Sequence, residues 1–127
     1  MTNEHTATVQ RAMSGFLETG DVDTLGTFLH PDFVHRRPGG HDASKAEWLD
    51  SVRAAQTRLT AMEVEIRHLL PAGDHVVVHT VRRLPGGPAI AVIELWRFAD
   101  GLIVEGNEII EPLAQVEANL RWWEPAR

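Results

Sequence analysis

Hydrophobic and polar positions change their period near residue 60 of this chain. Before that point, apolar side chains recur every three to four positions, a spacing that predicts amphipathic helices. The first predicted helix has one apolar face and ends at Gly20. That face carries Val9, Ala12, Met13, Phe16 and Leu17. After residue 60, apolar positions alternate with polar ones, which predicts β-strands.

A second, shorter helix is expected directly after the first. Asp21 fits its N-cap, and Pro31 ends it, because proline lacks the amide proton that a helix interior needs. The apolar face of this helix carries Val22, Leu25 and Leu29. Residues 32–37 then read as a short extended segment, followed by a glycine-rich turn.

A third helix is expected to open at a capping box. Ser44 and Glu47 have the spacing at which each side chain satisfies a backbone amide near the helix start. The buried side of this helix carries Trp48, Val52, Ala55 and Leu59.

Four strands are predicted after residue 60, over residues 62–70, 75–84, 89–98 and 102–113. On the first of them, one apolar face carries Met62, Val64, Ile66, His68 and Leu70, so His68 reads as a structural residue. Helices followed by an antiparallel meander make an α+β domain over residues 1–127, with residues 113–127 as a tail or last helical turn. A curved sheet partly covered by helices leaves a pocket.

Composition and charge exclude several classes of protein. The 127 residues are 43% hydrophobic and 24% charged, which is ordinary for a globular domain. The chain has no cysteine, so disulfides and thiolate metal sites are excluded. The net charge is −6, and the only basic clusters are Arg36-Arg37 and Arg82-Arg83, which argues against nucleic-acid binding. No signal peptide or membrane span is evident, so a cytoplasmic location is expected.

Glu108 is the first candidate for chemistry, because a carboxylate inside a strand needs compensation. It follows a hairpin signal at Asp100-Gly101. A two-residue turn would place Glu108 beside Ile93 and leave Glu94 on the other face. A three-residue loop with a glycine bulge would place Glu94, Trp96, Gly106 and Glu108 on one face. In a cavity, desolvation would raise the pKa of Glu108 towards neutral, and repulsion between two carboxylates would raise one pKa.

Other candidates are weaker and have structural alternatives. His79 lies in a strand, where a lone histidine is more often a hydrogen-bonded core residue. His35 reads from the residues alone as an exposed loop histidine next to two arginines. Trp48 and Trp96 are core aromatics or walls for a flat ligand. His30, His35 and His41 have spacings that match neither a helix face nor a strand face, so a metal site is not expected. Trp122 and Trp123 fit a pocket cap or a dimer contact.

The order of elements, with DFVHRRPGG, HVVVHT and IELWRFADGLIVEGNEII in these places, resembles the nuclear transport factor 2-like (NTF2-like) superfamily. The likeness covers about residues 5–113 and is greatest to the SnoaL-like polyketide cyclases. It implies a cone-shaped, cystatin-like barrel: three helices on a curved, mainly antiparallel sheet of four to six strands, with an internal cavity. It also implies a homodimer formed through the remaining sheet face.

The same resemblance implies a function. SnoaL-like members tend to read DGKIVEHWD where this chain reads DGLIVEGNE, so Glu108 falls on the family's acid/base carboxylate. Gly106 and Asn107 replace the family's histidine and tryptophan. The implied enzyme is cofactor-independent and cyclises, isomerises or performs aldol chemistry on a small hydrophobic carbonyl compound. Glu108 would move the proton, and His79, with His35, would stabilise the enolate oxygen.

Two alternatives stay open. The lost histidine favours a non-catalytic module that binds a small molecule or only dimerises. The third reading is an epoxide hydrolase of the limonene-epoxide type, which needs an Arg/Asp pair on an earlier strand, and VVVHTVRR does not obviously supply one.

Overall fold

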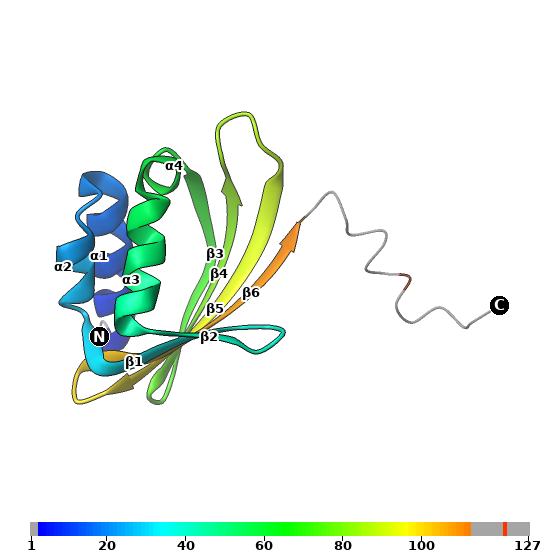
Figure 1. The fold of residues 1–127 in the computed structure, drawn as a ribbon. Helices are drawn as coiled ribbons and strands as arrows, with labels where there is room; N and C mark the ends of the chain where they lie inside the picture. Colours follow the sequence, from blue (N-terminus) through cyan, green and yellow to red (C-terminus); the bar gives the residue numbers. More distant parts are fainter. Residues whose placement is uncertain (1–2, 113–120, 122–127) are drawn as a thin grey trace.

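Helices and sheet form two layers. In the computed structural model, which describes residues 3–112 and 121, four helices lie on one face of a curved sheet (Figure 1). The helices are α1 (Glu4–Thr19), α2 (Val22–Gly26), α3 (Lys45–Ala54) and α4 (Gln56–Thr60). The strands are β1 (Leu29–Arg37), β2 (His41–Ser44), β3 (Glu63–Ala72), β4 (His75–Arg83), β5 (Ala89–Ala99) and β6 (Leu102–Pro112). The expected α+β class and helix-first order are confirmed.

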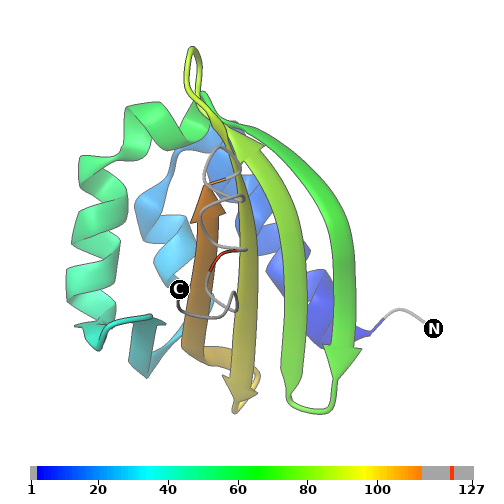
Figure 2. The same cartoon turned by 90° about the vertical axis from the view of Figure 1, so that its right-hand side faces the viewer.

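The six strands form one sheet in the order β2-β1-β6-β5-β4-β3. β1 pairs parallel with β6, and every other neighbouring pair is antiparallel. The sheet bends strongly around the helices but does not close, because β2 and β3 remain at its two edges (Figure 2). The expected barrel is therefore an open, curved sheet.

Local capping explains where the helices begin and end. The side chain of Asn3 accepts hydrogen bonds from two amides at the start of α1, and Gly20 ends that helix with a left-handed φ of 69°. Asp21 caps α2 as expected. The Ser44–Glu47 capping box is present at the start of α3.

Two of the helices are shorter than the sequence predicts. The second helix ends at Gly26, and Leu29 begins β1 instead of closing the helical face. The third helix breaks at Ala55, whose φ of −100° and ψ of 6° separate α3 from α4. A fourth helix and the short strand β2 therefore add to the predicted elements.

β3 changes the face of its side chains within its length. Its register with β4 shifts between Ile66 and His68, which leaves Arg67 as the extra residue of a bulge. Ile66 pairs with Thr80 on the inner face, towards the helices, whereas His68 pairs with His79 on the outer face. The predicted single apolar face of this strand is therefore wrong beyond Ile66.

The core fills the space between the helices and the inner face of the sheet. One cluster joins α1 to the strands and contains Val9, Leu29, Phe33, Val76, Val78, Trp96, Phe98 and Ile103. A second cluster joins the helices and contains Ala12, Phe16, Val22, Leu25 and Val52. Burying these side chains is the main source of stability for a domain without disulfides.

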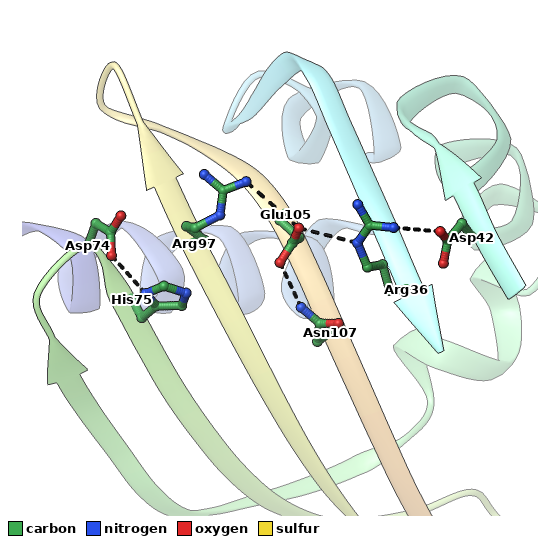
Figure 3. Close-up of polar contacts among 7 residues, drawn as sticks. All are labelled: Arg36, Asp42, Asp74, His75, Arg97, Glu105 and Asn107. Carbon is green, nitrogen blue, oxygen red and sulfur yellow. Dashed lines mark hydrogen bonds and ion pairs between the residues drawn. The ribbon is translucent and has the colours of Figure 1, made fainter. Parts of the chain in front are cut away.

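No described helix covers the outer face of the sheet (Figure 1). Towards the β5–β6 turn this face is polar: Glu105 accepts hydrogen bonds from Arg36 and Asn107, and Arg97 lies 3.7 Å away (Figure 3). Further along the strands the face is apolar, with Ile93 and Ile109 exposed beside each other. Within the described residues, no helix is long and apolar enough to cross a membrane.

Candidate functional site

The β5–β6 hairpin decides which face Glu108 takes. Asp100 and Gly101 form a two-residue turn in which both have positive φ, 54° and 77°. The pairing then shifts by one residue where Val104 bulges out of β6. As a result Glu94 pairs directly with Glu108. The turn has two residues, but the bulge behind it produces the register expected for the longer loop.

Both carboxylates line a cavity of about 460 Å³ between the helices and the inner face of the sheet. This volume lies within the range of small-molecule sites. The described lining is mostly aliphatic and aromatic, and its charged members are Arg37, Arg82, Glu94 and Glu108. The apolar lining includes Val9, Met13, Phe16, Leu29, Trp48, Val92, Trp96, Ile103 and Ile110.

The four charged side chains form a line across four strands. Arg82 on β4 binds Glu94 on β5, Glu94 faces Glu108 on β6, and Arg37 on β1 lies beside Glu108. Nε of Arg37 is 3.6 Å from Oε1 of Glu108. We call this row the Arg–Glu–Glu–Arg line. It places two carboxylates at the centre and one arginine at each end.

The two arginines are held differently. Nε of Arg82 donates to the hydroxyl of Thr80 over 2.9 Å, and its terminal nitrogen donates to Glu94. Only 15% of the Arg82 side chain is exposed. The side chain of Arg37 is 52% exposed, and among the described residues it donates no hydrogen bond.

His35 contacts Glu108 from the neighbouring strand β1. Its Nε2 lies 3.3 Å from Oε2 of Glu108, an ion-pair distance without the angle of a hydrogen bond. The imidazole is buried and packs against the ring of Trp48, with 5.1 Å between centroids. His35 is not among the residues that line the cavity. Its side chain therefore contacts Glu108 and not the cavity.

The surroundings push the pKa values of the two carboxyls in opposite directions. Burial raises the pKa of Glu94 above its ordinary value, and Arg82 opposes this only in part. The charge of Glu108 raises the pKa of Glu94 further. Burial also acts to raise the pKa of Glu108, but His35, Arg37 and Arg82 together lower it below its ordinary value.

The expected raised pKa of Glu108 is therefore wrong. Desolvation alone would raise the pKa of Glu108, but a histidine and two arginines stabilise its ionised form. The carboxyl with the raised pKa is Glu94, in line with the expectation that one member of a carboxylate pair shifts upwards.

Gly106 leaves room for Trp96. The two residues pair across β5 and β6, and a Cβ at position 106 would lie 2.8 Å from Cε3 of the indole and closer still to Cζ3. On the other side, Gly106 pairs with His35 of β1. A histidine at position 106 would collide with Trp96, but β1 brings a different histidine to Glu108.

His79 lies on the outer face of the sheet, beside Ile93 and His68. Its Nδ1 is 3.1 Å from Nδ1 of His68. The structure does not bring His79 to Glu108, which faces the cavity on the inner side.

The remaining histidines and tryptophans are separate from this site or outside the described residues. His30 lies near Asp32 and Asp100, and His41 pairs with Arg37 in the β1–β2 hairpin. No group of three or more metal-binding side chains occurs within residues 3–112. Trp122 and Trp123 lie outside the described residues.

Arg37 and Arg82 are the site residues that the sequence reading missed. In the sequence each is one half of a basic pair, whereas in the strands the two side chains of each pair take different faces of the sheet. Strand alternation carries the signal: Arg82 is two positions from the buried Thr80, and Arg37 is two positions from His35.

Comparison with known proteins agrees with this architecture. Wild-type IdmH, a putative polyketide cyclase from Streptomyces antibioticus, is 24% identical, with a TM-score of 0.67 over 85% of this chain and 97% of that chain. TerC, co-crystallised with polyporic acid, is 21% identical, with a TM-score of 0.72 over 91% and 97%. An NTF2-like protein of unknown function from Burkholderia pseudomallei is 19% identical, with a TM-score of 0.74 over 91% and 97%. These likenesses show the fold alone.

No curated protein matches this chain in sequence. A family model described as the SnoaL-like domain matches residues 9–106, most of the chain. The protein therefore belongs to the SnoaL-like domain family, and its fold is that of NTF2-like proteins.

Proposed function

We propose that this protein is a cofactor-independent enzyme that moves a proton on a small hydrophobic carbonyl compound. The observation that carries the proposal is the direct pairing of Glu94 with Glu108 inside an apolar cavity, with pKa values shifted apart. Two carboxyls separated in this way divide the roles of acid and base between them. The proposal also draws on the SnoaL-like family and on the putative polyketide cyclase among its structural neighbours.

Each carboxyl has one role. The ionised Glu108 accepts the proton alpha to the carbonyl, and the electron pair of that C–H bond forms the enolate. The protonated Glu94 donates a hydrogen bond to the developing oxygen anion, in place of the histidine that the sequence reading assigned. His35 positions the carboxylate of Glu108.

The enolate then determines the product. In an aldol or cyclisation step its carbon attacks a second carbonyl carbon of the same molecule, and Glu108 returns the proton to the new alkoxide. In an isomerisation, Glu108 returns the proton to a different carbon. Neither route needs an external oxidant or reductant. Trp48 and Trp96, which line the cavity, would provide flat apolar walls for the substrate.

Exchange of the alpha hydrogens of 2-tetralone in heavy water tests this proposal, because it needs only the first step. We expect the wild-type protein to accelerate the exchange and Glu108→Gln to reduce it by about 10²–10⁴-fold with similar 2-tetralone affinity. Glu105→Gln is the matched control, since Glu105 lies on the outer face of the same strand. If 2-tetralone binds without exchanging, the protein is a binding module.

One observation favours a second candidate reaction, the opening of an epoxide. The Arg82–Glu94 pair opposite Glu108 supplies an arginine and two carboxylates in one cavity, although the pair spans two strands. In this reaction one carboxylate would activate water and the other would protonate the epoxide oxygen. Transfer of ¹⁸O from labelled water into a diol product would favour this reading over enolate chemistry.

The quaternary structure is part of the proposal. A homodimer through the outer face would bury the exposed apolar side chains of Leu70, Ile93 and Ile109. Contiguous apolar surface of this kind marks contact sites on soluble domains. The neighbouring polar cluster around Glu105 would form the rim of such an interface (Figure 3).

A further inference from the structure

The Arg–Glu–Glu–Arg line has an arginine at each end, but the two arginines differ in the hydrogen bonds that they make. At one end, Arg82 is only 15% exposed, and its Nε and one terminal nitrogen donate hydrogen bonds to Thr80 and Glu94. At the other end, Arg37 lines the same cavity, is half exposed, and touches Glu108 only through Nε at 3.6 Å. Among residues 3–112 and 121, the two terminal nitrogens of Arg37 donate no hydrogen bond, which leaves them available to a ligand.

The charge around Arg37 also favours an anion. Glu108 carries one negative charge, which it shares with His35, Arg37 and Arg82. Burial raises the pKa of Glu94, so this carboxyl takes up a proton, and loses its negative charge, more readily than it would in water. Wherever Glu94 is protonated, the two arginines of the line face one ionised carboxylate, and within the described residues the side chain of Arg37 donates no hydrogen bond.

We infer that Arg37 is the anchor for an anionic end of the ligand, and that the cavity takes a flat apolar compound bearing a carboxylate or an equally acidic enol. This inference rests on the proposed function for the role of the cavity and adds the class of ligand. A guanidinium presents a planar fork of N–H groups that fits a carboxylate with two parallel hydrogen bonds. The apolar part of the ligand would extend from Arg37 towards Trp48 and Trp96.

The anchor differs from the arginine pairs elsewhere on the surface. Arg53 is equally exposed, but it binds Asp23 and Asp50, both at 3.1 Å, on the outside of the helices. Arg36, next in sequence to Arg37, points to the outer face and binds Glu105 and Asp42. These arginines already have carboxylate partners.

A matched pair of probes tests the inference: 2-naphthoic acid, ionised at pH 7, and the neutral 2-naphthamide of the same shape. Titration calorimetry should show that the wild-type protein prefers the acid by about tenfold or more, the effect expected of charge-assisted hydrogen bonds. Arg37→Gln should abolish this preference and leave the affinity for the amide unchanged. Arg53→Gln is the control and should keep the preference.

Glu108→Gln provides a second readout. Removing its charge takes away the group that competes for Arg37 and repels the ligand, so 2-naphthoic acid should bind more tightly while 2-naphthamide is unaffected. Raising the salt concentration should weaken only the acid.

Three results would overturn the inference: equal affinity for the two probes, an acid preference that survives Arg37→Gln, or failure of both probes to bind. Because none of these measurements uses turnover, they are separate from the proposed reaction. Acid preference together with full exchange activity in Glu108→Gln would support the anchor and reject the acid/base assignment.

Discussion

The indole of Trp96 occupies the space where a side chain at position 106 would lie. A Cβ added to Gly106 would be 2.8 Å from Cε3 of that ring, a distance that requires the ring or the strand to move. The ring cannot move freely, because Trp96 is 6% exposed and packs between core residues on β1 and α3. Gly106 is thus a packing requirement of Trp96 and not a weakness of the strand.

Gly106→Ala should therefore lower the free energy of unfolding by about 1–3 kcal/mol, the usual cost of overpacking. Chemical denaturation measures the change. Gly15→Ala serves as the control, because nothing lies within 4 Å of its added Cβ in α1, and alanine should stabilise that helix by about 0.5–1 kcal/mol. An equal loss for Gly106→Ala in a Trp96→Ala background would contradict the proposed collision.

His35→Asn should raise the pKa of Glu108. Without the imidazole, one of the groups that lower the pKa of Glu108 is lost, and the opposing effect of burial on the charged carboxylate is offset less. Carbon NMR of the Glu108 carboxyl measures the shift, with the resonance assigned through Glu108→Gln. His30→Asn is the control, since His30 contacts Asp32 and Asp100 instead. If the titration of Glu108 is unchanged in His35→Asn, His35 does not influence the pKa of Glu108.

The same contact has a consequence for stability. The pKa of Glu108 is lower in the folded protein than its ordinary 4.5, so ionised Glu108 stabilises the fold above that pH. This stabilisation is lost as the pH falls through the folded pKa. We expect the stability difference between wild type and His35→Asn to shrink below pH 4.5, which denaturation at several pH values would show.

Proton exchange from 2-tetralone should follow a bell-shaped pH dependence. The rate falls on the acid side as Glu108 becomes protonated below 4.5, and it falls on the alkaline side as Glu94 loses its proton through its raised pKa. Glu94→Gln should retain part of the activity and lose the alkaline limb, because an amide donates a hydrogen bond without titrating in this range. Persistence of that limb in Glu94→Gln would assign it to another group.

The helix-first α+β order and the capping residues were predictable because they depend on local spacing. Ser44 and Glu47 show this, since a capping box is complete within four residues. The end of the second helix was not predictable in the same way, because Leu29 fits a helical face equally well as the start of a buried strand. Pairing of β1 with β6 decided between the two, and that contact spans more than seventy residues.

The face of the sheet that a side chain takes depends on single-residue bulges, and the alternation of apolar and polar residues does not reveal where these bulges lie. The bulge at Val104 places Glu108 opposite Glu94, and the bulge at Arg67 turns His68 to the outer face. The alternation pattern therefore left both faces possible for Glu108, and it predicted the wrong face for His68. The pKa of Glu108 depended on His35, Arg37 and Arg82, which strand pairing brings from β1 and β4.

Ile93→Lys tests the proposed homodimer. Ile93 is 38% exposed at the centre of the apolar outer face, paired with Ile109 on one side and His79 on the other. A lysine there would have to lose its hydration in an interface, so the dimer should dissociate while the fold persists. Sedimentation should show about twice the chain mass of 14.1 kDa for wild type and the single mass for the variant.

Ile66→Lys is the matched control for that experiment. Ile66 is 46% exposed on β3 but pairs with Thr80, so it faces the helical side of the sheet. Dissociation by Ile93→Lys alone would place the interface on the outer face. If both variants remain dimeric, the interface lies elsewhere, and if wild type is a monomer, the apolar outer face needs a different partner. Because Glu94, Glu108 and Arg37 all face the inner side, 2-naphthoic acid should bind the dissociated Ile93→Lys variant with wild-type affinity.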